Sequence, residues 1–242
     1  MKLSVIIPCY NEEKRLGNTL RDIDKYLSSQ SYDYEILVVD GGSSDRTVKI
    51  AKKMQLGIKN LKVIDKKENH GKGYVVRQGM LKSRGNYCLF TDADNSTSID
   101  HIEKMWSLFE KGFDVVIGSR DEKDAPGAYQ AVSQPAWKRT LGNIGNIVIQ
   151  MVAIWGIWDT QCGFKAFNKK AAQEIFKRAK ANGWAFDVEA LGLAKKLGYK
   201  IGIIPVFWVN SAESKVKLKG YFSFLKELCE IKLNFIFNRY GK

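Results

Sequence analysis

The first half of the chain alternates short apolar runs with segments of helical length, and this rhythm limits the possible folds more than any other feature. In 12–27, for example, apolar side chains recur every three or four residues, as on one face of a helix. A strand, helix, strand order implies parallel pairing with helices on both faces of the sheet. The sequence therefore predicts an α/β sandwich with a mainly parallel sheet. The predicted strands are 3–9, 35–40, 61–65, 87–91, 114–118 and 200–204.

The composition is that of a globular protein with an anionic partner. The 242 residues are 45% hydrophobic, which suits one large domain or a domain with an appendage. A formal net charge of +13 favours nucleic acid, a phosphorylated substrate or an acidic membrane surface. The four cysteines form no CxxC pair, so we expect buried thiols in a reducing compartment and no structural zinc site.

Two segments raise the question of membrane contact. The first run is too short for a secretion signal or a membrane span, so we expect a cytoplasmic first strand. Residues 211–242 mix aromatic and aliphatic side chains with lysines, as in a basic amphipathic helix on a membrane surface. A helix that packs on its own domain fits equally well. We therefore expect a domain over 1–210 and an amphipathic tail over 211–242.

Polar residues follow the predicted strands at the end where parallel sheets bind ligands. The first strand leads into Asn11 and Glu12, the second ends in Asp40, and the fourth leads into Asp92 and Asp94. Such residues also serve as turn and cap residues, which is our interpretation of 43–45. For Asp40 and Asp92 we favour a functional role, because each ends an apolar strand before the turn begins.

The Asp92-Ala93-Asp94 segment is the strongest candidate for chemistry. Residues two apart in an extended chain face the same side, so the two carboxylates can act together. Hard oxygen ligands without histidine or cysteine suit Mg²⁺ or Mn²⁺, completed by water and a substrate phosphate. The sequence therefore predicts a divalent cation that carries a diphosphate.

Two further segments suit a nucleotide. Asp40 could accept hydrogen bonds from a nucleobase or ribose. Gly71-Lys72-Gly73 opens a helix, so its backbone or Lys72 could approach phosphate. Neither a Walker pattern nor GxGxxG is present, which argues against a P-loop ATPase and a dinucleotide oxidoreductase.

Taken in order, these motifs resemble inverting family-2 glycosyltransferases with the GT-A fold. The resemblance rests on the segments 8–12, 38–47, 92–94 and 118–120. More narrowly, 159–165 (Asp-Thr-Gln-Cys-Gly-Phe-Lys) and 184–189 (Trp-Ala-Phe-Asp-Val-Glu) resemble dolichyl-phosphate glucose synthases. The eukaryotic members carry an N-terminal membrane anchor, whereas here Met1 leads directly into the first strand. We therefore expect a peripheral enzyme on the cytoplasmic membrane face.

The resemblance implies a UDP-sugar donor, a polyprenyl phosphate acceptor and a role for particular residues. Asp92 and Asp94 would hold the metal, while Arg120 with Lys138 or Arg139 would hold the acceptor phosphate. Asp94, Arg120 and Lys165 are the predicted catalytic residues. The predicted nucleotide-binding residues are Pro8, Tyr10, Asn11, Glu12, Asp40, Gly42, Lys72 and Asp92. Candidates to order the sugar or acceptor are Asp159, Gln161, Asp187 and Glu189, although Asp187 and Glu189 could equally brace a helix.

The predicted reaction is sugar transfer with inversion, most simply from UDP-glucose. A phosphate monoester has a second pKa of about 6, so the acceptor is already a nucleophile near neutral pH. N-acetylglucosamine or mannose as the sugar, and a soluble or glycan acceptor, remain alternatives. A nucleic-acid-binding protein is the alternative outside enzymes, but the sequence lacks a recognised nucleic-acid module and we expect no nucleic-acid partner.

Overall fold

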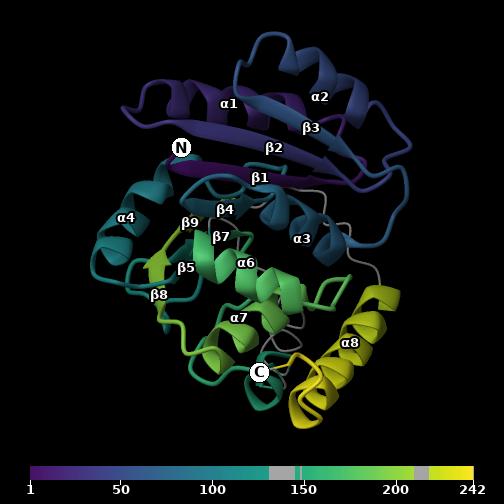
Figure 1. The fold of residues 1–242 in the computed structure, drawn as a ribbon, viewed down its shortest axis with the longest axis vertical. Helices are drawn as coiled ribbons and strands as arrows, with labels where there is room; N and C mark the ends of the chain where they lie inside the picture. The colour runs from purple at the N-terminus through teal and green to yellow at the C-terminus, as the bar shows by residue number, and fades with distance from the viewer. Residues whose placement is uncertain (131–144, 148, 210–217, 242) are drawn as a thin grey trace.

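The computed structural model describes residues 1–130, 145–147, 149–209 and 218–241. These residues form a seven-stranded sheet with helices on both faces (Figure 1), as the strand and helix rhythm predicts. Across the sheet the strands are β3 (Leu61–Asp65), β2 (Tyr34–Asp40), β1 (Leu3–Cys9), β4 (Tyr87–Thr91), β7 (Phe164–Asn168), β5 (Val115–Ser119) and β8 (Ile201–Pro205).

The predicted mainly parallel α/β sheet is confirmed, and its six predicted strands agree with the structure to within one residue at each end. The sequence missed β7, which lies between β4 and β5 and is antiparallel to both. Its five residues include a lysine, and Phe164, Lys165, Ala166 and Phe167 are all buried, so no alternation of polar and apolar residues marked it as a strand. β7 therefore carries the last two residues of the 159–165 motif into the sheet, between β4 and β5.

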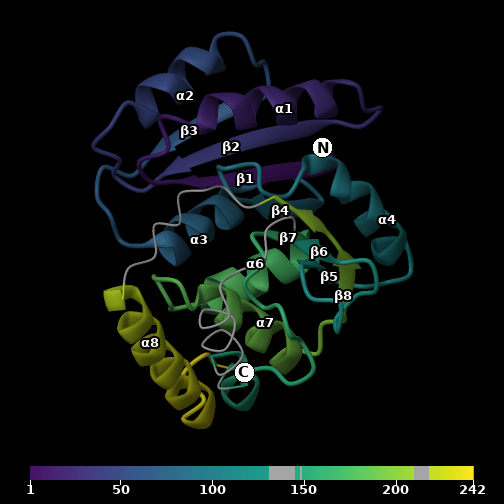
Figure 2. The ribbon, with the colours of Figure 1, turned by 180° about the vertical axis from the view of Figure 1, so that it is seen from behind.

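The helices lie in two layers. On one face α1 (Leu16–Ser28), α2 (Thr47–Gln55) and α4 (Ile102–Glu110) cover the sheet, and on the other face α3 (Lys72–Lys82), α6 (Lys169–Arg178) and α7 (Phe186–Lys196) do so (Figures 1 and 2). β1 shows the division: Leu3, Val5 and Ile7 enter one core and Ile6 the other. A 3-10 turn, η1 (Ile99–His101), precedes α4, and the short strands β6 (Tyr129–Gln130) and β9 (Phe207–Trp208) pair separately.

The first helix begins at Leu16 rather than at residue 12. Asn11 has a positive φ of 53°, and its backbone N–H donates to Ser43 Oγ (2.8 Å). The Glu12 N–H donates to Thr47 Oγ1 (2.7 Å). These contacts with the loop after β2 hold 11–15 outside the helix, which leaves the segment at the edge of the sheet where we expect a ligand.

The described part of the tail forms α8 (Leu218–Ile236), and one face of it joins the core. Leu228 and Ile231 are 1% and 2% exposed and pack with α7, as does Tyr240 after the helix. The sequence left membrane binding and packing open, and the structure shows packing for this face. The division of the chain at residue 210 stays a prediction.

Candidate active site

The loops after β1 and β2 are bound to one another at the carboxyl edge of the sheet. Besides the bond from Asn11 to Ser43, the Ser44 N–H donates to Asn11 Oδ1 (2.9 Å). The Glu13 N–H donates to Asp45 Oδ2 (3.1 Å), while Asp45 Oδ1 accepts from the N–H of Thr47, the first residue of α2. Asp45 thus stabilises the start of α2, as the sequence indicated.

Asp40 anchors the turn after β2. Its fully buried carboxylate accepts hydrogen bonds from the N–H groups of Gly42 (2.9 Å) and Ser43 (2.8 Å), and from Ser43 Oγ (2.5 Å). Asp40 therefore serves the turn, which was the alternative to the nucleotide-binding role that we favoured, because a strand can end in the residue that begins a turn. Contact of Asp40 and Gly42 with a nucleotide stays a prediction, as it does for Pro8 within β1 and for Tyr10, which is 47% exposed.

Each carboxylate of the Asp92-Ala93-Asp94 segment faces a cationic side chain. Lys72 Nζ lies 2.6 Å from Asp92 Oδ1, and Arg15 Nη1 lies 3.7 Å from Asp94 Oδ2. Arg15 also donates through Nε to Glu12 Oε2 (2.7 Å), so it joins the loop after β1 to that after β4. Sequence reasoning missed Arg15, although its place three residues after Glu12 is a spacing at which opposite charges meet. The chain itself thus supplies cations to both aspartates.

The two aspartates fit a divalent cation that takes its other ligands from elsewhere. Their side chains are 36% and 22% exposed, and the described residues hold no group of three or more His, Cys, Asp or Glu able to bind a metal. Mg²⁺ is often held by one or two carboxylates with water and substrate phosphate. Gly163 makes room for this site, because a Cβ there would overlap the Asp92 carboxylate.

Lys72 lies between the Asp92 carboxylate and two aromatic rings. Its Nζ is 5.5 Å from the ring centroid of Trp184 and 6.0 Å from that of Phe186. Burial disfavours the charged ammonium, but Asp92 and Asp187 outweigh that effect and raise the pKa of Lys72 above its ordinary value. Lys72 therefore stays charged at neutral pH and can pair with an anion.

Beneath these residues lies a buried ion pair between Lys165 and Asp187. Lys165 is 0% exposed, and its Nζ donates to Asp187 Oδ1 (2.7 Å) and to the Cys162 carbonyl (2.5 Å). Burial raises the pKa of Asp187, and the neighbouring Lys165 and Lys72 reduce the rise without cancelling it. The contacts shown for Lys165 are structural, and a direct catalytic role stays a prediction.

Arg120 forms a bidentate ion pair with Asp159. Arg120 Nε lies 2.7 Å from Oδ2 and Nη2 lies 2.8 Å from Oδ1, while the Trp208 ring centroid is 5.2 Å from its Cζ. Burial would raise the pKa of Asp159, but Arg120 lowers it below its ordinary value. Asp124, which sequence reasoning missed, holds the Asp159 N–H (2.7 Å). Arg120 is thereby fixed in direction, and binding of an acceptor phosphate stays a prediction.

The other candidates are placed as follows. Lys138 and Arg139 lie outside the described residues. Gln161 is exposed, and its N–H donates to Asp159 Oδ1 (3.3 Å). Glu189 is 0% exposed and accepts from the N–H groups of Lys180 and Ala181 and from the Tyr240 hydroxyl (2.7 Å). The structure therefore supports the bracing interpretation of Glu189, and its contact with a sugar is untested.

The glycines around Lys72 serve a contact between loops. In the first turn of α3, the N–H groups of Gly73 and Tyr74 donate to the carbonyls of Gly183 and Asn182 (3.1 Å each). A Cβ at Gly71, which has a φ of +96°, would overlap the Asn182 carbonyl. The N–H groups of Gly73 and Tyr74 are thus not open to phosphate, because another loop satisfies them. The Lys72 side chain, the other possibility in our expectation, points to Asp92, and its contact with phosphate stays a prediction.

A Gly73→Ala variant tests this close contact. The new Cβ would lie 2.6 Å from both the Ala181 carbonyl oxygen and Phe186 Cβ, so we expect a loss of about 1–3 kcal/mol in the free energy of unfolding. Urea unfolding measures it. Gly57→Ala is the control, because a Cβ there would lie 3.9 Å from the Met54 carbonyl oxygen, in ordinary contact. Equal midpoints for the two variants would contradict the prediction.

A mostly parallel α/β sheet with paired aspartates and facing cations at its carboxyl edge is the arrangement expected of the GT-A-like glycosyltransferase class, and the family match places the protein in that class. Residues 4–176 match the family described as Glycosyl transferase family 2. The chain belongs to this family, as its motifs predicted.

Within the family, the chain is similar to dolichyl-phosphate beta-glucosyltransferases. It is 35% identical to that of Dictyostelium discoideum over 247 residues, which cover 97% of this chain and 75% of the relative. The human protein is also 35% identical, over 97% of this chain and 76% of its own length. The Saccharomyces cerevisiae protein is 34% identical, over 98% and 76%.

Among solved structures, the chain is similar in fold to glucosyl-3-phosphoglycerate synthase from Mycobacterium tuberculosis. Its complex with Mn²⁺, UDP and glucosyl-3-phosphoglycerate superposes with a TM-score of 0.70 over 96% of this chain and 79% of that one. The sequence identity is 15%, so this likeness supports the predicted fold alone.

Proposed function

We propose that the protein transfers glucose from UDP-glucose to a polyprenyl phosphate of the dolichyl type, with inversion at the anomeric carbon. The observation that carries the proposal is the meeting of Asp92 and Asp94 with Lys72 and Arg15 at the edge of the sheet. This site accounts for the donor. The acceptor is proposed from the relatives, which are dolichyl-phosphate beta-glucosyltransferases at about 35% identity.

At the donor end, Asp92 and Asp94 would hold Mg²⁺ or Mn²⁺. When bound, the metal supplies positive charge that stabilises the departing diphosphate. Lys72 is already charged and lies 2.6 Å from Asp92, so its ammonium is well placed to pair with the same anion. The loops at 10–12 and 40–43, which are bound to one another, would hold the nucleoside.

At the acceptor end, Arg120 would bind the phosphate together with Lys138 or Arg139. Asp159 fixes the direction of the Arg120 guanidinium, which pre-organises it for a bidentate anion. An acceptor phosphate oxygen attacks the anomeric carbon while the bond to UDP breaks and the electron pair leaves with UDP. Alignment rather than proton removal then sets the rate, because the acceptor is already ionised near pH 7.

A donor panel tests the reaction class and the sugar together. Radiolabelled UDP-glucose, UDP-N-acetylglucosamine and GDP-mannose are each incubated with dolichyl phosphate and Mg²⁺ or Mn²⁺, and label in the organic phase is counted. We expect product from UDP-glucose that disappears with EDTA. Product from another donor would show that the proposed sugar is wrong. UDP binding without any lipid product would show that the acceptor is a soluble molecule instead of a lipid phosphate.

We further propose that the enzyme meets its lipid acceptor by peripheral contact with an anionic membrane on the cytoplasmic face. The outer side of α8 exposes Phe222 (76%) and Ile236 (61%), and Phe237 (63%) directly follows the helix. Beside α8, where Lys232 Nζ donates to the Met151 carbonyl (3.0 Å), lies a segment that exposes Trp155 (73%). These side chains, with the lysines of α8, suit the interface of an acidic bilayer.

The described residues contain no helix that is long and apolar enough to cross a bilayer.

Vesicle flotation tests the proposed membrane contact. We expect the protein to float with vesicles that contain phosphatidylserine, and less so at high salt, because salt screens the lysines. Trp155→Ser combined with Phe237→Ser should weaken binding about tenfold or more, since full burial of one such ring contributes roughly 1.5–3 kcal/mol and about 1.4 kcal/mol is a factor of ten in affinity. Leu56→Ser is the control, because Leu56 is 90% exposed just after α2. An equal loss in the control would refute this assignment of the surface.

A further inference from the structure

The segment 179–185, between α6 and α7, is attached on one side to the start of α3. Besides backbone bonds, the Arg77 side chain holds this segment at two points. As a result α3 and 179–185 form one unit next to the donor site. The bonds run from Gly73 N to Gly183 O (3.1 Å), from Tyr74 N to Asn182 O (3.1 Å), from Arg77 Nη1 to Ala179 O (2.9 Å) and from Arg77 Nη2 to Asn182 Oδ1 (2.9 Å).

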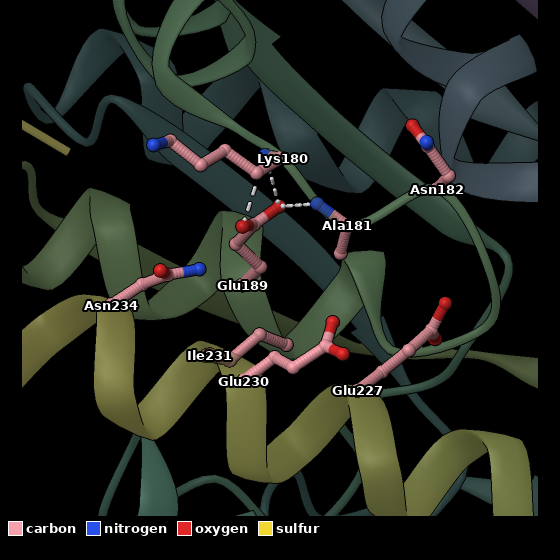
Figure 3. A pocket seen from close by; sticks show the side chains of 8 residues that line it. All are labelled: Lys180, Ala181, Asn182, Glu189, Glu227, Glu230, Ile231 and Asn234. Carbon is pink, nitrogen blue, oxygen red and sulfur yellow. Dashed lines mark hydrogen bonds between the residues drawn. The ribbon is translucent and has the colours of Figure 1, made fainter. Parts of the chain in front are cut away.

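On its other side the segment is held by α8. Glu227 Oε1 accepts from the Gly183 N–H (2.8 Å) and Oε2 from the Ala185 N–H (2.9 Å). A Cβ at Gly183 would overlap the Glu227 carboxylate, so the backbone can approach this carboxylate only because residue 183 is glycine. Figure 3 shows Glu227 at one end of the pocket between α8 and this segment, and Glu189 bound to the other end of the segment.

The residues that Glu227 holds flank the site. Between Gly183 and Ala185 lies Trp184, whose ring faces the Lys72 ammonium, and Lys72 in turn contacts Asp92. Both oxygens of Glu227 are thus used to fix the backbone on either side of Trp184. A carboxylate that accepts two N–H groups makes strong, directional bonds, which suits a rigid support.

We propose that Glu227 is a positioning residue for the donor site: through 183–185 it fixes Trp184 and Lys72 for the bound nucleotide sugar. The inference rests on the donor site of the proposed function and goes beyond it. It assigns α8 a part in binding the donor, whereas the sequence predicted only a tail that contacts membrane or covers the domain. Glu227 itself does not contact the reacting atoms.

The test compares Glu227→Gln with Glu230→Gln, a change less than one turn further along α8. Glutamine keeps one acceptor oxygen but turns an amide group toward the second N–H, so one bond is lost. Glu230 is 59% exposed and pairs with Lys226 at 3.9 Å, so its change leaves the segment intact. Two quantities are measured in the full chain: UDP binding in the presence of Mn²⁺ by calorimetry, and hydrogen exchange of the amides of 180–186.

We expect Glu227→Gln to speed exchange in 180–186 and to weaken UDP binding about tenfold, with Glu230→Gln unchanged in both. In turnover, the KM for UDP-glucose should rise while kcat stays within about twofold. Glu227→Asp, which keeps the charge, should recover part of the affinity and guards against a folding defect in the glutamine variant.

Each other outcome decides against the inference in a different way. Faster exchange with unchanged UDP affinity would make Glu227 a purely structural residue and overturn the proposal. An equal loss of affinity in Glu230→Gln would overturn it too, because the effect would then be one of charge. If the unaltered protein binds no UDP with Mn²⁺, the donor site of the proposed function fails, and this inference fails with it.

Discussion

An Asp94→Ala variant is expected to transfer sugar about 10³-fold more slowly than the unaltered protein. The metal supplies several kcal/mol of stabilisation to the departing diphosphate, and each 1.36 kcal/mol is a factor of about ten in rate. Loss of Asp94 leaves Asp92, whose carboxylate is already paired with Lys72 at 2.6 Å. One carboxylate shared with an ammonium is a weak ligand, so the metal should be lost. Initial rates with UDP-glucose and dolichyl phosphate at saturating Mn²⁺ measure the effect.

The matched control is Glu110→Ala, which removes an exposed carboxylate at the end of α4, outside the site. It should keep full activity. Calorimetry separates binding from chemistry: metal-dependent UDP binding should vanish in Asp94→Ala, while circular dichroism shows that the variant is folded. Retention of more than about a tenth of the rate by Asp94→Ala would show that the metal, if used, is held elsewhere.

A Lys165→Met variant is expected to lose about 3–5 kcal/mol in the free energy of unfolding. Methionine fills much of the same volume, but it leaves the buried Asp187 carboxylate without the ammonium 2.7 Å away. An uncompensated buried charge is costly, and breaking such a pair from one side has this typical magnitude. Burial already raises the pKa of Asp187, so its carboxylate can take up a proton once the ammonium is gone. The loss in the free energy of unfolding should therefore lie near the lower end of the expected range. Urea unfolding at neutral pH measures it.

Two further variants isolate the ion pair from the loss of a side chain. Lys177→Met removes an exposed lysine of α6 and should change stability by less than about 0.5 kcal/mol. Lys165→Met combined with Asp187→Leu removes both charges and should be more stable than Lys165→Met alone, since an apolar pair can replace a buried ion pair at little cost. With Asp187→Leu measured alone as well, a double variant as unstable as the sum of the two single changes would show that the two charges do not interact.

Much of the architecture could be predicted from the sequence because it depends on near neighbours in the chain. The strand at 3–9 is an apolar run with few polar residues, and Leu16, Leu20, Ile23 and Leu27 are all buried along one side of α1, as their spacing indicated. The polar residues after the strands were also placed correctly at one edge. That placement follows from parallel pairing, in which every carboxyl end lies on the same side.

The errors fall where contacts between distant segments override local pattern. β7 was missed because a strand buried on both faces, with a lysine as its second residue, shows no alternation of polar and apolar residues. The segment around Gly71 and Gly73 was expected to let the backbone or Lys72 approach phosphate, but residues about 110 positions later occupy the space beside these glycines. The start of α1 was misplaced because the side chains of Ser43, in the loop after β2, and of Thr47, the first residue of α2, hold the residues before it.

The sequence by itself determined the α/β class, the edge of the sheet that carries the site, the paired aspartates and the glycosyltransferase family. Only the tertiary structure decided which charges meet: Lys72 with Asp92, Arg120 with Asp159, Lys165 with Asp187, and Glu227 with the backbone beside Trp184. The physical reason is range. Periodicity and strand ends are set by residues a few positions apart in the chain. The partner of a buried charge instead depends on which distant loops the fold brings within about 3 Å of each other.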